Sequence, residues 1–129
     1  MPLYRLMDKN PVSKIPFEDE YRRWTRALGV VNYTAIRAEF NRLIDERLAS
    51  NDPNDQIHTA GWIPGNDWNG TVWAPIYYEA TDQDPVQSAL CFGLLCYAAF
   101  MDREEKWIVG KFELNGKAIG SNTYFMSST

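Results

Sequence analysis

The longest apolar stretch of the chain, residues 89–101, most constrains the fold. It reads ALCFGLLCYAAFM, thirteen residues without a charge. A helix needs about 20 apolar residues to cross a bilayer, so this stretch predicts a helix buried in a protein core. Asp84 as N-cap and Pro85 as first helical residue mark its start, and we expect it to end near Asp102. Because apolar residues surround its axis, it is expected to be the central helix of the core.

Cys91 and Cys96 lie in this stretch, five positions apart. On a helix that spacing separates the two Cα atoms by about 8 to 9 Å, which is beyond disulfide reach. We expect two buried, reduced thiols, as in a cytoplasmic protein. The N-terminal residues show no apolar signal segment, which favours the same compartment. Gly93 is expected to admit a close backbone neighbour or to leave a hollow.

Two further helices are predicted before this one. Residues 17–28 form the first, with Gly29 as its C-cap. Residues 33–49 form the second, with Asn32 or Thr34 as its N-cap. Apolar residues recur every three or four positions along one face of each helix: Phe17, Tyr21, Trp24 and Leu28 in the first, and Tyr33, Ile36, Phe40, Leu43, Ile44 and Leu48 in the second.

Two strand-like runs near the C-terminus flank Asn115-Gly116, a pair favoured in the turns of two-residue β-hairpins. This turn predicts a register in which three pairs face each other: Phe112 with Ile119, Ile108 with Thr123, and Trp107 with Tyr124. Residues 56–63 are expected to add a third strand. The predicted fold class is therefore α+β, with three main helices packed on a small antiparallel sheet that includes the C-terminal β-hairpin. We expect residues 1–129 to form a single compact domain.

Residues 58–75, HTAGWIPGNDWNGTVWAP, hold three of the five tryptophans and the only histidine. In one interpretation Trp62, Trp68 and Trp73 are lids that fix a long loop over the core. In the other, these rings line a ligand pocket, because long loops without regular structure are often functional. The two interpretations are compatible, since a fixed loop makes a rigid pocket wall. The following residues, PIYYEA, predict one or two helical turns with Pro75 in the first.

The charge distribution indicates what such a site would bind. Residues 48–102 contain seven acidic residues and no Lys or Arg. Nucleic acid is therefore not expected as a partner, and cations are attracted. Aromatic faces also attract cations. The sequence predicts a small acidic cytoplasmic module that holds a cationic small molecule or a basic partner side chain. The predicted ligand-binding residues are Trp62, Trp68, Trp73, Tyr77, Tyr78, Asp67 and Glu79.

Two other functions fit the same residues. The first is a small hydrolase in which His58 acts as general base, oriented by Asp55 or Asp67. The second is an inhibitor or interaction protein that docks an acidic face on a basic protein. The sequence contains no Walker, dinucleotide-binding or zinc-protease motif. One histidine and two helical cysteines are too few ligands for a closed zinc site, so no metal is expected. No other cofactor and no membrane contact are expected either.

Overall fold

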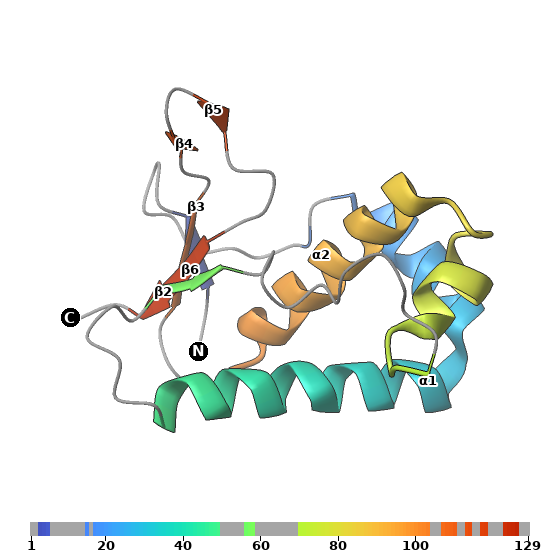
Figure 1. The fold of residues 1–129 in the computed structure, drawn as a ribbon, viewed down its shortest axis with the longest axis horizontal. Coiled ribbons are helices and arrows are strands. Elements are labelled where there is room, and N and C mark those ends of the chain that lie inside the picture. Colours follow the sequence, from blue (N-terminus) through green and yellow to red (C-terminus); the bar gives the residue numbers. More distant parts are fainter. Residues whose placement is uncertain are drawn as a thin grey trace.

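The computed structural model of the protein describes residues 3–5, 15, 17–49, 56–58, 70–103, 107–110, 113–114, 117–118 and 123–126. Its elements, in chain order, are β1 (Leu3–Arg5), α1 (Glu18–Ala49), β2 (Gln56–His58), the short π-helix η2 (Ile76–Ala80), α2 (Pro85–Met101), β3 (Trp107–Gly110), β4 (Glu113–Leu114), β5 (Lys117–Ala118) and β6 (Thr123–Met126). Figure 1 shows α2 packed across α1, with the sheet beside the C-terminal end of α1.

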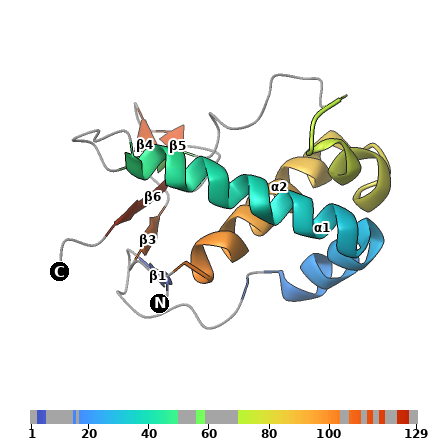
Figure 2. The ribbon, with the colours of Figure 1, turned by 90° about the horizontal axis from the view of Figure 1, so that it is seen from below.

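Helix α1 bends sharply at Gly29. This residue has φ 80° and ψ 164°, a conformation that is open almost only to glycine. The bend divides α1 into a first limb, residues 18–28, and a second limb, residues 30–49 (Figure 2). Asn32 does not act as the predicted N-cap acceptor. Its side-chain amide donates to the carbonyl of Leu28 at 2.9 Å, and so satisfies an acceptor at the end of the first limb.

The predicted apolar faces of the two limbs are largely confirmed. The buried residues of α1 are Trp24, Leu28, Ile36, Phe40 and Ile44. Phe17 is the exception, because its side chain is 60% exposed. With φ 53° this residue stands just outside the helix, so helical spacing does not place its side chain on the buried face.

Helix α2 begins and ends as predicted. The Asp84 side chain accepts hydrogen bonds from the backbone N–H groups of Val86 at 2.9 Å and Gln87 at 3.1 Å, and Asp102 is the C-cap. Most of the side chains of α2 are buried, which confirms its central position in the core. Of the two alternatives expected at Gly93, the structure favours the hollow over the close backbone neighbour: within the described part of the chain, an added Cβ would meet no atom within 4 Å.

The main sheet has the strand order β1-β3-β6-β2. Strand β6 pairs antiparallel with both β3 and β2, whereas β1 pairs parallel with β3. Strands β4 and β5 form a separate antiparallel pair on the two sides of Asn115-Gly116, with Leu114 opposite Lys117.

The predicted register between β3 and β6 is wrong by two residues. Ile108 lies opposite Phe125, and Tyr124 lies opposite Val109. The reason is an unequal number of connecting residues: 111–112 link β3 to β4, whereas 119–122 link β5 to β6. An even shift leaves every side chain on its original face of the sheet. Tyr124 and Val109 are accordingly both buried. The predicted pair of Phe112 with Ile119 lies outside the described residues.

The predicted fold class is also wrong. The described residues are mostly helical, with two long helices and one short helix in place of three main helices. The two predicted helices do form, as the two limbs of α1, and they follow each other directly at the non-helical Gly29 because residues 30–32 are already helical. The sheet is not purely antiparallel, because β1 joins it in parallel. The β1 segment has no alternating pattern of its own, and only its packing, with Leu3 fully buried, makes it a strand.

Side chains from both long helices, η2 and the sheet belong to one buried cluster. Two groups of rings lie within it. In the first group, Phe40, Trp73 and Phe92 contact one another. In the second group, Phe100 stacks on Tyr124 with ring centroids 3.9 Å apart. None of the described helices is long and apolar enough to span a membrane.

Candidate functional site

Several predicted site residues lie outside the described part of the chain: Asp55, Trp62, Asp67 and Trp68. His58 ends strand β2, where its backbone pairs with Thr123 of β6. His58 therefore lies on a strand, as the sequence predicts. Its two predicted acidic partners, Asp55 and Asp67, lie outside the described residues, so the general-base hypothesis is not tested. This hypothesis stays a prediction.

Trp73 is part of the core. Its side chain is 5% exposed, and its ring centroid lies 4.9 Å from those of both Phe40 and Phe92. Its backbone N–H donates to the hydroxyl of Thr71 at 3.2 Å, which fixes the turn that leads into the core. A ligand on the surface therefore reaches very little of this ring. For Trp73 the structure favours the lid interpretation over the pocket interpretation.

The other described members of the predicted site lie on η2. The rings of Tyr77 and Tyr78 meet edge to face with centroids 5.0 Å apart, and Tyr78 is 47% exposed. Glu79 is exposed and accepts a hydrogen bond from the Asn32 side chain at 2.8 Å. The predicted helical turn at PIYYEA is present, with Pro75 as the N-cap of η2 and not inside its first turn. The structure thus brings together three of the seven predicted ligand-binding residues, on one short helix beside the bend of α1.

A tight turn after η2 adds a further carboxylate. The backbone N–H of Gln83 donates to the carbonyl of Tyr77 at 2.7 Å, so the turn folds back along η2. Asp82 lies in this turn with an exposed side chain. Asp84 follows, but its carboxylate is occupied as the N-cap of α2. We call Tyr77, Tyr78, Glu79 and Asp82 the η2 surface.

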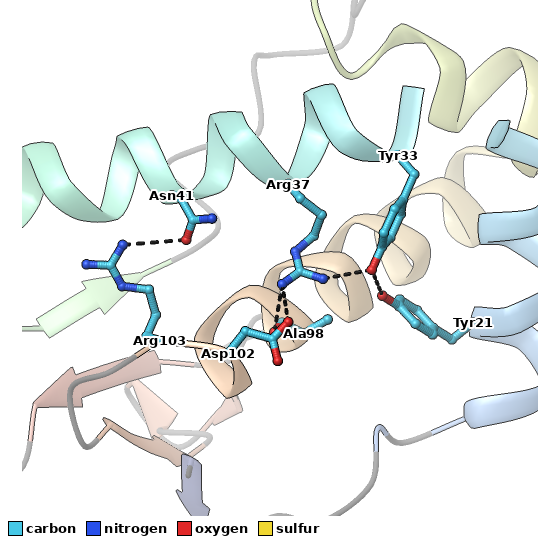
Figure 3. Close-up of polar contacts among 7 residues, drawn as sticks. All are labelled: Tyr21, Tyr33, Arg37, Asn41, Ala98, Asp102 and Arg103. Carbon is cyan, nitrogen blue, oxygen red and sulfur yellow. Dashed lines mark hydrogen bonds and ion pairs between the residues drawn. The ribbon is translucent and has the colours of Figure 1, made fainter. Parts of the chain in front are cut away.

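A chain of polar contacts that the sequence does not reveal connects α1 to α2 (Figure 3). The hydroxyls of Tyr21 and Tyr33 are 2.9 Å apart, and Arg37 donates to the Tyr33 hydroxyl at 2.7 Å. Arg37 also donates to the Asp102 carboxylate at 2.6 Å and to the Ala98 carbonyl at 3.3 Å. The Arg37 guanidinium therefore supplies the positive charge that the C-terminal end of α2 lacks within its own last turn.

Burial and the hydrogen bond with Tyr33 raise the pKa of Tyr21 well above its ordinary value. Burial lowers the pKa of Arg37, but the hydrogen bond to Asp102 and the nearby tyrosines outweigh it, so the pKa rises. Tyr21 therefore stays neutral and Arg37 stays charged over the whole physiological range. Because neither group changes its charge near neutral pH, we assign this chain of contacts a structural role.

A groove about 410 Å³ in volume opens at the bend of α1. The first limb contributes Arg22, Thr25 and Arg26, and the second limb contributes Val30 and Tyr33, with Gly29 between them. A helix face that mixes arginine and acidic side chains is ordinarily a solvated face, so these charged residues by themselves give no signal for the groove. The signal that exists is Gly29 itself, since the break that it produces brings the two limbs together.

The two cysteines offer no reactive site. Both are free and buried, which confirms their predicted burial. Burial raises the pKa of the Cys91 thiol to about 12 and that of Cys96 well above its ordinary value, so both remain protonated thiols at neutral pH. Among the described residues, no group of three or more His, Cys, Asp or Glu side chains is placed to hold a metal ion.

Comparisons of the chain with known protein families, curated proteins and solved structures found no match. Function is therefore inferred from the side chains of this chain alone.

Proposed function

We propose that the protein is a small acidic binding module. It holds a cationic group, either of a small molecule or of a basic partner side chain, on the η2 surface. One observation carries the proposal: an exposed aromatic ring and an exposed carboxylate, those of Tyr78 and Glu79, stand at adjacent positions of one short helix. Aromatic faces and carboxylates are the two protein groups that attract cations most directly.

The charge around η2 supports this proposal. Asp82 adds a second exposed carboxylate within three residues of Glu79. No Lys or Arg occurs between residues 48 and 102, so no basic side chain of this segment neutralises them. The carboxylates of this segment attract cations, and this attraction weakens as salt is added.

The η2 surface is also partly fixed in place. Asn32 holds the Glu79 carboxylate by a neutral hydrogen bond, which orients the group and leaves its negative charge intact. The edge-to-face contact with Tyr77 restricts the Tyr78 ring. Groups that are already oriented lose less conformational entropy when a ligand binds. A cation over an exposed ring gains about 0.5 to 2 kcal/mol from that ring, so we expect weak to moderate affinity for a small ligand.

Two parts of the proposal rest on the sequence alone. Contributions of Trp62, Trp68 and Asp67 to the same ligand remain predictions. A cytoplasmic location is likewise part of the proposal, and the two free, buried cysteines support it.

Matched probes test the proposal. Choline carries a quaternary ammonium group, and 3,3-dimethylbutan-1-ol is its neutral carbon analogue. We expect choline to bind with at least tenfold higher affinity than the alcohol, and its affinity to fall as salt is added. Isothermal titration calorimetry at low and high salt measures both effects. Equal binding of the two compounds would show that charge has no role at this surface.

Two variants locate the binding. Tyr78→Ala removes the exposed ring and Glu79→Gln removes the charge, while the glutamine oxygen still accepts from Asn32. Each is expected to weaken choline binding severalfold. Glu46→Gln makes the same charge change at an exposed position of the second limb and serves as the control, with choline binding unchanged. Loss of binding in the control to the same extent as in Glu79→Gln would overturn the assignment to the η2 surface.

A further inference from the structure

A second charged surface lies at the bend of α1, and its charge is opposite to that of the η2 surface. Arg22 and Arg26 are four residues apart on the first limb, so their guanidinium groups share one face of the helix. Both line the groove. Guanidinium groups bind carboxylate and phosphate oxygens in pairs of parallel hydrogen bonds.

The two arginines are available to a ligand. The side chain of Arg26 is exposed and forms no hydrogen bond or ion pair with another described residue. Arg22 pairs with Glu18 at 2.5 Å, but its side chain is 69% exposed, and such exposed pairs contribute little. The Thr25 hydroxyl donates to the Arg22 carbonyl, so it offers a ligand only its acceptor oxygen. Among the polar side chains that line the groove, the two guanidinium groups are therefore the main hydrogen-bond donors.

The opposite wall of the groove is apolar. Val30 is 81% exposed, although it is a large apolar residue at the start of the second limb. Tyr33 lies one turn further on, and its hydroxyl is held by Tyr21 and Arg37, so its ring is fixed. Gly29 has no side chain, and its positive φ strongly disfavours any other residue at the floor of the bend. Cationic donors on one wall and apolar groups on the other define an amphipathic site.

We infer that this groove binds a small organic anion, in which a phosphate or carboxylate group lies between Arg22 and Arg26 and an apolar body rests on Val30 and Tyr33. The groove is largely open to solvent, and its volume of about 410 Å³ has room for a group larger than an inorganic ion. This site is separate from the cation-binding surface proposed above, and neither proposal depends on the other.

Three probes test the two halves of the inference. Phenyl phosphate carries both the anion and an apolar ring, inorganic phosphate carries only the anion, and benzyl alcohol carries only the ring. We expect phenyl phosphate to bind at least tenfold more tightly than either of the others, as measured by calorimetry. Benzoate in a parallel titration distinguishes a carboxylate from a phosphate preference. Inorganic phosphate that binds as tightly as phenyl phosphate would overturn the role of the apolar wall.

Variants test the position of the site. Arg26→Gln is expected to reduce phenyl phosphate affinity at least tenfold, and Val30→Ser severalfold. Arg42→Gln removes an exposed arginine from the second limb, away from the groove, and is the matched control, with affinity unchanged. Unfolding midpoints of all three variants show whether each remains folded. Phenyl phosphate binding that survives intact in a folded Arg26→Gln protein, or that is absent in the wild type, would overturn the inference.

Discussion

Tyr21 is held in its neutral form inside the polar chain between α1 and α2. Burial raises its pKa, and the hydrogen bond with Tyr33 raises it further. The unfolded chain loses this proton near pH 10. The contribution of Tyr21 to stability is therefore complete below pH 10 and is lost as pH rises through the higher pKa of the folded state.

We expect ultraviolet absorbance titration of the folded protein to show a tyrosine that ionises only at strongly alkaline pH, or on unfolding. Tyr21→Phe should lower the amplitude of this late step by one tyrosine. Tyr78→Phe, which also removes one tyrosine, should leave the amplitude of the late step unchanged and is the control. An undiminished late step in Tyr21→Phe would contradict the assignment to Tyr21.

The contact between Arg37 and Asp102 tests whether the polar chain stabilises the fold. The Arg37 side chain is only 16% exposed, so removing its charged partner leaves a mostly buried guanidinium less well satisfied. We expect Asp102→Asn to lower the free energy of unfolding by about 1 to 2 kcal/mol, measured by urea denaturation. Glu46→Gln breaks a pair whose two members are both exposed, and little change is expected. Equal losses in the two variants would contradict a special role for the contact between Arg37 and Asp102.

At the scale of elements, two glycines in the helices have opposite roles. Gly29 has φ 80° and forms the bend of α1, whereas Gly93 is in a helical turn of α2 with open space around it. We expect Gly29→Ala to destabilise the protein by about 1 to 3 kcal/mol, because alanine is strained in this conformation. Gly93→Ala should stabilise it by up to about 1 kcal/mol through its higher helix propensity. Thermal or urea unfolding of the two variants measures both effects, and a stabilised Gly29→Ala protein would contradict the bend.

The same elements show which structural features can be predicted locally. Asp84 and Pro85 mark the start of α2 because capping depends only on neighbouring residues. The break at Gly29 is predictable for the same reason, but its angle is not. The register of β3 against β6 differs by two residues from the register of β4 against β5, because four residues, 119–122, connect one side and two residues, 111–112, the other. The preference of Asn-Gly for a two-residue turn predicts only the register next to the turn.

The candidate sites follow the same division. Tyr78 and Glu79 are predictable as neighbours because they are adjacent in the sequence. Arg37 and Asp102 are 65 positions apart, and only the packing of α1 on α2 brings them together. Trp73 was open to two interpretations in the sequence, since a ring in a loop serves equally as a lid or as a pocket wall. The contacts with Phe40 and Phe92 place it in the core.

At the scale of the whole molecule, the account assigns opposite charges to two neighbouring surfaces. The η2 surface carries carboxylates and tyrosines, and the groove at the bend of α1 carries arginines. Asn32 connects the first limb of α1 to η2, because its side-chain amide donates hydrogen bonds to the Leu28 carbonyl and to the Glu79 carboxylate. Figures 1 and 2 both show η2 beside the bend. We propose that these two surfaces, in a protein with a net charge of −4, differ in the charge of the ligand that they prefer.

Amide chemical shifts can locate both ligands on the protein in one experiment. Backbone amide spectra of the isotope-labelled protein are recorded with choline alone and with phenyl phosphate alone. The account predicts that choline shifts the amides of residues 77–82 and that phenyl phosphate shifts those of residues 22–30, with little overlap. Shifts of the same residues by both probes, or no shifts in either segment, would contradict it.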